Sequence, residues 1–448
     1  MTYEEAKELL SNHGQEQVLK FWETLTEEAR AALLGQIASI DFESLERMKG
    51  LLNAAPSEGA ADEGRPEAVA PEVVEWTDSL YAEAKAVGER ELAAGRVAVL
   101  LVAGGQGSRL GYDGPKGAYG IGPLSGRPVF YFHSRKVLAL CRRHGARVPF
   151  YIMTSEMNHE ATVACFRENG YFGLDPADVI FFRQGMWPAL DADGRILLDQ
   201  PSHIFMSPDG HGGTLTALDR NGCLADMKRR GIEAVFYFQV DNPMVEIADA
   251  AFIGLHTMRK ADISLKLVAK RDPKEGVGVV VKRGERFEMV EYSELSDEQA
   301  NRRREDGELY FKYGSVAIHV FSRVFMEREA RKAMPLHIAH KKISYCRDDG
   351  TVVKPEKANG CKFEKFIFDV LPDAGTVLNL AFDRAEEFSP VKNAEGNDSP
   401  ATCRRDLQAK WGRWLGLPED SQIPLEIDPA YALDADELRS KGIRLESL

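Results

Sequence analysis

A glycine-rich loop that follows an apolar run constrains this chain more than any other segment. The run reads Val97-Ala-Val-Leu-Leu-Val-Ala-Gly-Gly-Gln-Gly-Ser-Arg-Leu-Gly111, and Pro115-Lys116 follows just downstream. A continuous apolar stretch of this kind is typical of a strand buried on both faces. Glycines after such a strand let backbone N–H groups approach phosphate oxygens, and Arg109 and Lys116 can neutralise a leaving pyrophosphate. The loop therefore predicts a cradle for a nucleotide triphosphate.

Two other nucleotide motifs fit this loop less well. A dinucleotide fingerprint needs G-x-G-x-x-G and an acidic residue about 20 positions further on. Gly105 and Gly107 supply two glycines, but Leu110 stands at the sixth position and the next strand candidate does not end in a carboxylate. The P-loop pattern is absent because no hydroxyl residue follows Lys116. The alternative is a strand and turn in which the glycines serve the backbone geometry alone. The basic residues Arg109 and Lys116 argue against it.

Length and charge bound the remaining possibilities. A chain of 448 residues has room for two or three domains, and its net charge of -13 argues against binding to nucleic acid or an anionic membrane. No apolar run approaches the roughly 20 residues of a membrane span. The acidic start lacks the features of a signal peptide, so we expect a cytoplasmic protein. The six cysteines form no C-x-x-C pair and suggest neither a zinc site nor a redox site.

The apolar patterns predict three consecutive segments. Residues 1–94 read as a helical N-terminal segment, with capping-box spacing at Thr2/Glu5 and Thr24/Glu27 and a linker or exposed loop at about 54–72. Residues 95–387 alternate strands with helices, and residues 388–448 read as a small, loop-rich C-terminal segment. The predicted strands are 97–102, 148–153, 179–183, 234–240, 262–269, 277–282, 287–292 and 315–321.

The predicted fold class is α/β, with a mixed, mainly parallel sheet flanked by helices and an antiparallel insertion. Such sheets bind ligands beyond the carboxyl ends of their strands, where residues 104–116 would lie. Asp241 ends another apolar strand, and a carboxylate there is a natural ligand for Mg²⁺. A second glycine loop, Ser207-Pro-Asp-Gly-His-Gly-Gly213, could direct backbone N–H groups at a sugar phosphate. The alternative interpretation of Asp241 is an Asx turn at a strand end, and that of the loop at 207–213 is a solvated polar loop.

The longer string L-x-G-G-x-G-[TS]-R-L-G-x-x-x-P-K resembles the signature of the UTP–hexose-1-phosphate uridylyltransferases. Within them the chain is most similar to the eukaryotic-type UDP-N-acetylhexosamine pyrophosphorylases, from about residue 8 to residue 403. Ser108 stands where the family usually has Thr. The resemblance implies a nucleotide-diphospho-sugar transferase-like fold, Mg²⁺ as cofactor, and UTP and a sugar 1-phosphate as small-molecule substrates.

The resemblance also implies roles for single residues on the nucleotide side. Arg109, Lys116 and Lys392 would act on the phosphates, Gln184 in Phe181-Phe-Arg-Gln-Gly-Met-Trp-Pro188 would read the uracil, and Asp241 would hold the metal. The remaining nucleotide-binding positions would be Gly104, Gly105, Gly107 and Gly210.

On the sugar side, Gly278 would contact the hexose through its backbone, and Glu291 would accept hydrogen bonds from its hydroxyls. Phe366 and Phe368 would wall the pocket. His211 and Ser315 would also face the sugar, and both depart from the asparagines of the N-acetylhexosamine enzymes. His211 matches the glycine loop of the related UDP-glucose pyrophosphorylases. His319 reads instead as a core histidine.

The sequence thus predicts a UDP-sugar pyrophosphorylase, a nucleotidyltransferase that forms a UDP-sugar and pyrophosphate from UTP and a sugar 1-phosphate. N-acetylglucosamine 1-phosphate is the leading sugar. Glucose or galactose 1-phosphate is the alternative, because of His211 and Ser315. A non-catalytic nucleotide-binding homologue is the other alternative, and the retained Arg109, Lys116 and Asp241 argue against it.

Overall fold

The computed structural model describes residues 1–53, 66–418, 421 and 423–442. The chain folds into two compact units, each assembled from separate stretches of sequence. Unit 1 combines residues 1–65, 184–214 and 333–369, and unit 2 combines residues 66–183, 215–332 and 370–448. The predicted boundaries near residues 94 and 387 divide the chain into consecutive segments. The two units interleave along the sequence and do not test these boundaries, which stay a prediction.

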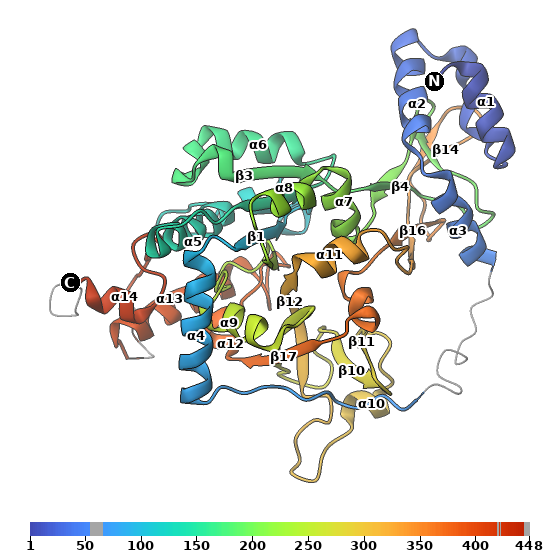
Figure 1. Cartoon of the computed structure of the whole chain (residues 1–448). Coiled ribbons are helices and arrows are strands. Elements are labelled where there is room, and N and C mark those ends of the chain that lie inside the picture. Colours follow the sequence, from blue (N-terminus) through green and yellow to red (C-terminus); the bar gives the residue numbers. More distant parts are fainter. Residues whose placement is uncertain (54–65, 419–420, 422, 443–448) are drawn as a thin grey trace. The chain divides into compact units, whose positions relative to one another are not determined.

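Unit 2 is built on a nine-stranded sheet (Figure 1). Its strands are β1 (Val97–Val102), β2 (Phe150–Thr154), β3 (Val179–Arg183), β8 (Ala234–Gln239), β9 (Ile263–Ala269), β10 (Val279–Arg283), β11 (Arg286–Val290), β12 (Tyr313–Ser322) and β17 (Val377–Phe382). Eight of them coincide within a few residues with the predicted strands. The ninth, β17, was not predicted.

The sheet of unit 2 combines parallel and antiparallel strand pairs. The main path runs β11-β10-β12-β8-β1-β2-β3, and β9 pairs with both β12 and β17. Pairing is parallel from β8 through β1 and β2 to β3, and also between β9 and β17. Strand β12 runs antiparallel to β8 and β9, and β10 and β11 form an antiparallel hairpin. The predicted fold class, a mainly parallel sheet with an antiparallel insertion, is confirmed.

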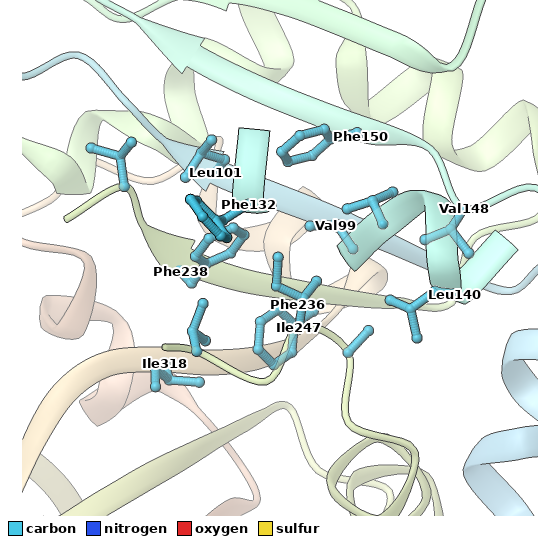
Figure 2. Packing of buried hydrophobic residues seen from close by; sticks show 14 of the residues in the cluster. Val99, Leu101, Phe132, Leu140, Val148, Phe150, Phe236, Phe238, Ile247 and Ile318 are labelled. Atoms are coloured by element: carbon cyan, nitrogen blue, oxygen red, sulfur yellow. The ribbon is translucent and has the colours of Figure 1, made fainter. Parts of the chain in front are cut away.

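Helices enclose the apolar strands of unit 2. They include α4 (Asp78–Ala93), α5 (Val129–His144), α6 (His159–Glu168), α8 (Cys223–Arg229), α9 (Ala250–Arg259), α11 (Arg323–Glu329) and α13 (Pro400–Leu415). Figure 2 shows β1, β2 and β8 contributing Val99, Leu101, Phe150, Phe236 and Phe238 to one buried cluster, with Phe132 and Leu140 from α5. Burying each of these side chains contributes roughly 1.5–3 kcal/mol, which fixes the strand ends from which the loops emerge.

Unit 1 contains three N-terminal helices and several short antiparallel pairs. The helices are α1 (Tyr3–Asn12), α2 (Glu27–Ser39) and α3 (Phe42–Asn53). The strand pairs are β4 (Met186–Pro188) with β7 (Met206–Pro208), β5 (Leu198–Gln200) with β6 (His203–Ile204), β13 (His337–Lys341) with β16 (Gly360–Glu364), and β14 (Tyr345–Cys346) with β15 (Val352–Val353). Leu10, Leu33 and Leu45 of the helices are buried in one cluster with Trp187 and Phe363.

The prediction of a loop-rich segment after residue 388 is wrong in part. The sixteen-residue helix α13 lies there, with Ser399 and Thr402 forming its capping box and Pro400 as its first residue. Leu407 and Trp411 are one helical turn apart and both are buried in the core of unit 2. The serine, the proline and the apolar spacing were visible in the sequence as helix signals.

Two smaller expectations also change. Thr2 and Glu5 form the predicted capping box, but α2 is capped by Thr26, and Thr24 instead ends a short 3₁₀ turn. Residues 54–65 of the predicted linker lie outside the described residues. Further along it Val69 donates a backbone hydrogen bond to Lys282 of β10, at 2.9 Å. Within the part of the chain that the structure describes, no helix is both long enough and apolar enough to cross a bilayer.

Candidate functional site

The first glycine loop leaves the carboxyl end of β1 and folds back on itself. The N–H of Gly107 donates to Gly114 O at 2.9 Å, and the N–H of Lys116 donates to Gly105 O at 3.0 Å. Asn158 clamps the base of the loop, because its side-chain amide donates to Ala103 O at 2.9 Å and to Gly105 O at 3.3 Å. The loop is therefore held in shape before any ligand binds, and Gly105 stays exposed at its surface.

Lys116 and Asp241 meet beside this loop. Asp241 follows β8, which is paired in parallel with β1, so both residues lie beyond the same edge of the sheet. The Lys116 Nζ lies 3.8 Å from the Asp241 Oδ2, and their side chains are 19% and 13% exposed. This arrangement places an ammonium and a carboxylate at the carboxyl ends of two neighbouring strands. Arg109 lies on the short helix η3 (Ser108–Leu110) and is exposed.

The segment that carries Lys392 is attached directly to the Asp241 turn. The N–H of Val391 donates to Asp241 O at 2.7 Å, and the N–H of Lys392 donates to Asp398 O at 2.7 Å. Lys392 is itself partly buried. Asn242, which follows Asp241, accepts from the N–H of Ser389 and donates to Glu387 O. Three predicted phosphate and metal residues, Lys116, Asp241 and Lys392, are thus gathered in unit 2.

Three predicted sugar residues of unit 2 also lie together. The N–H of Ser315 on β12 donates to Gly278 O at 2.8 Å. A side-chain methyl on Gly278 would lie 3.2 Å from Glu291 Oε1, so Gly278 and Glu291 are neighbours. Strand β12 bulges directly after Ser315, where Ala317 adopts a left-handed conformation with φ 58°. The bulge turns this stretch of strand away from regular pairing, as bulges near sites commonly do.

The second glycine loop belongs to unit 1 and is organised by Asp209. The N–H of Asp209 donates to Gly185 O at 3.0 Å, and its carbonyl accepts from the N–H of Lys365 at 2.8 Å. Gly210 has φ 83°, in the region that favours glycine. At Gly212, a Cβ atom would lie 2.6 Å from the carbonyl carbon of Phe366, so only glycine fits there.

Aromatic rings surround His211 in this loop. The His211 ring stacks on Phe366 with centroids 5.4 Å apart, and Phe368 lies 5.7 Å away. His337 stacks on the same Phe366 ring at 4.1 Å and pairs with Asp369 at 2.9 Å. The N–H of Ile367 donates to His211 Nδ1 at 3.1 Å, so that nitrogen is unprotonated and Nε2 carries the hydrogen.

The enclosure of His211 also fixes its charge. Burial lowers the pKa of His211 to about 4, against a smaller opposing effect of Asp369. The imidazole is therefore neutral at physiological pH and offers one N–H donor. An asparagine at this position would offer a donor and an acceptor on one amide group. Gln184, the predicted uracil reader, lies partly exposed between β3 and β4.

The glycine loop, the strand-end carboxylate and the sheet order together invite comparison with known proteins. A family model described as UTP–glucose-1-phosphate uridylyltransferase matches residues 45–397, which is most of the chain. The chain belongs to this family. That result confirms the predicted family resemblance and, at the level of the family, the predicted enzyme class.

Relatives within the uridylyltransferase family cover nearly all of the chain. It is 40% identical to a human UDP-N-acetylhexosamine pyrophosphorylase-like protein 1, over 96% of this chain and 91% of that one. It is 36% identical to a UDP-N-acetylglucosamine pyrophosphorylase of Saccharomyces cerevisiae, over 92% of this chain and 91% of the other. A solved UDP-N-acetylglucosamine pyrophosphorylase from Trypanosoma brucei superposes with a TM-score of 0.83 at 27% identity, covering 96% of this chain and 93% of that one.

Some residues that shape the uridylyltransferase loops were not singled out from the sequence. Asn158 holds the first loop, and Asp209 and Lys365 hold the second, where Lys365 Nζ also lies 4.5 Å from the centre of the Trp187 ring. Asn158 had a sequence signal, since it immediately precedes a helix that follows a predicted strand. Lys365 had none, because its partners lie more than a hundred residues away along the chain.

Proposed function

We propose that this chain transfers the uridylyl group of UTP to N-acetylglucosamine 1-phosphate, forming UDP-N-acetylglucosamine and pyrophosphate. The observation that carries the proposal is the pairing of Lys116 with Asp241 beside the glycine loop at the carboxyl ends of β1 and β8. Phosphoryl transfer needs mainly positioning and charge neutralisation, and this constellation offers both.

In the proposed reaction, an oxygen of the sugar phosphate attacks the α-phosphorus of UTP. A new P–O bond forms, and the bond to the β-phosphate oxygen breaks so that pyrophosphate leaves. The attacking oxygen already carries negative charge, so no general base is required. Lys116 and Arg109 would neutralise the leaving pyrophosphate, the backbone at Gly104, Gly105 and Gly107 would border the triphosphate, and Lys392 would balance charge on the phosphates.

Asp241 fits the role of a Mg²⁺ ligand. Its carboxylate is half-buried at a strand end, and Mg²⁺ prefers one or two carboxylates together with phosphate oxygens. A bound Mg²⁺ would supply positive charge to the phosphates. The Lys116 Nζ lies 3.8 Å from the Asp241 Oδ2, so an ammonium and a carboxylate face each other beside the loop.

The sugar residues of each unit are proposed to act as the resemblance implies. Gly278, Glu291 and Ser315 form one group in unit 2, and His211, Phe366 and Phe368 form another in unit 1. Gln184 would read the uracil and Gly210 would border the nucleotide. N-acetylglucosamine 1-phosphate is preferred because relatives named for that sugar cover 92% and 96% of the chain. The neutral single donor at His211 favours glucose 1-phosphate as the second candidate.

The test is pyrophosphate release with UTP and, in turn, the 1-phosphates of N-acetylglucosamine, N-acetylgalactosamine, glucose and galactose. We expect the highest kcat/KM with N-acetylglucosamine 1-phosphate. A preference for glucose 1-phosphate would overturn the sugar assignment, and no release with any of the four would overturn the enzymatic one. Arg109→Ala is expected to lower turnover by at least about tenfold, as loss of one preorganised charge does.

A further inference from the structure

A partly buried group of charged residues lies in unit 2, close to the Asp241 turn. Glu246, Asp249 and Glu387 place carboxylate oxygens within 4.8 Å of one another. Such a group resembles a cation site, but the protein supplies its own cation. The Lys266 Nζ lies 3.0 Å from Asp249 Oδ2 and 2.5 Å from Glu387 Oε1, and Lys266 is 1% exposed. The ammonium thus stands where a metal ion would have to bind.

Lys266 is attached to the rigid part of the unit. It lies on β9, and its ammonium also rests 5.3 Å from the centre of the Phe252 ring on α9. Asp249 caps the same helix, because its Oδ1 accepts from the N–H of Ala251 at 3.0 Å. Burial alone would lower the pKa of Lys266, but the surrounding carboxylates outweigh it and raise the pKa, so the charge persists. The ion pair therefore ties Glu387 to a strand and a helix of the core.

A continuous series of contacts leads from Glu387 to Asp241 and Lys392. Asn242, which is 4% exposed, donates to Glu387 O at 2.7 Å and accepts from the N–H of Ser389 at 3.2 Å. The N–H of Val391 then donates to the carbonyl of Asp241 at 2.7 Å. Residues 387–391 are thereby fastened alongside the Asp241 turn, and Lys392 is the next residue.

We propose that Asn242 and the Lys266–Glu387 ion pair are positioning residues that set where Lys392 lies relative to Asp241. Neither group needs to contact a substrate. The inference rests on the proposed function, since it assigns the fastened segment the task of presenting Lys392 to the phosphates. A buried ion pair of this kind adds little to stability on average, which makes orientation the better account of its presence.

The principal test is the Asn242→Ala variant. We expect kcat to fall by about 10- to 100-fold, because a displacement of about 1 Å near reacting groups has that effect. KM for both substrates should stay within about threefold, since the variant leaves the binding contacts in place. The matched control is Asn379→Ala, which removes another buried asparagine whose amide donates to a backbone carbonyl, that of Glu72. The control should be destabilised but retain its kcat.

A double-mutant cycle with Lys392→Ala separates the inference from the proposed function. If Asn242 acts through Lys392, Asn242→Ala should cost little further rate in the Lys392→Ala background. If the two effects multiply, Asn242 does not act through Lys392 and the inference is overturned. If Lys392→Ala alone leaves the rate unchanged, the proposed role of Lys392 fails and the inference falls with it.

A measurement independent of activity completes the test. Hydrogen exchange of the unliganded Asn242→Ala variant should speed up at Val391 and Lys392 while the core strands keep their protection. Unchanged exchange at these amides would overturn the proposal. Lys266→Met alone leaves buried carboxylates without a partner and can prevent folding. The combined Lys266→Met and Glu387→Gln variant removes both charges, and we expect it to fold with the same loss in kcat.

Discussion

The two glycine loops of this protein have similar compositions but different surroundings. The loop at 104–117 is held by backbone hydrogen bonds and Asn158, and it leaves Gly105 and Arg109 exposed. The loop at 207–213 is buried against backbone and aromatic rings, so that Gly210 and Gly212 approach Lys365 and Phe366 closely. Gly105 of the first loop has open space beside it, whereas Gly210 and Gly212 of the second loop are packed against the protein itself.

The largest expected effect concerns the cation of the first loop. Lys116→Ala should lower kcat by about 100-fold or more, because a preorganised charge on the phosphates is lost while Asp241 loses its neighbour. Initial rates of pyrophosphate release with UTP and N-acetylglucosamine 1-phosphate give the measurement. Lys228→Ala, at an exposed lysine of α8, is the control and should keep the normal rate. Near-normal turnover of Lys116→Ala would contradict the proposal that the first loop binds the phosphates.

A matched pair of glycine substitutions tests the comparison itself. Gly212→Ala should reduce the free energy of unfolding by about 2 kcal/mol, because the new methyl meets backbone atoms at 2.6 Å. Gly105→Ala has no atom within 4 Å of the added methyl and should leave stability unchanged. It should still weaken UTP binding by roughly tenfold, since a phosphate can no longer approach that backbone. Denaturant unfolding and calorimetric titration with UTP measure the two effects.

The ring cluster of the second loop can be tested through sugar preference. His211→Asn replaces a single N–H donor with an amide that also accepts hydrogen bonds. We expect the ratio of kcat/KM for N-acetylglucosamine 1-phosphate to that for glucose 1-phosphate to rise by about tenfold. The affinity for UTP should not change. An unaltered ratio would mean that this loop does not select the sugar.

The smallest expected effect is on the pH dependence of stability. The pKa of His211 is near 4 in the folded chain, below its ordinary value, so the unfolded chain takes up the proton first as pH falls. His211 thus favours the folded state fully above pH 6.5, and this contribution is lost between pH 6.5 and 4. Denaturation curves at pH 7.5 and 5 should show His211→Asn losing about 1 kcal/mol less than the parent chain.

The strands and the first loop could be read from the sequence because their signals are local. Val97–Val102 is apolar throughout, and the glycines, Arg109 and Lys116 follow within twenty residues. Helix α13 also has local signals, namely Ser399, Pro400 and the spacing of Leu407 and Trp411. Strand β17 has an apolar pattern that was not recognised, and it pairs with β9, more than a hundred residues earlier in the chain.

The sequence by itself determined the fold class and the family, and it predicted a phosphate cradle at residues 104–116. Only the tertiary structure decided that Lys116 lies beside Asp241, that Ser315 bonds to Gly278, and that His211 is neutral with its hydrogen on Nε2. It also decided that Lys266 ties Glu387 to the core. The physical reason is that hydrophobic periodicity and turn chemistry are written in neighbouring residues. Charge state, tautomer and orientation depend on partners that only folding brings into contact.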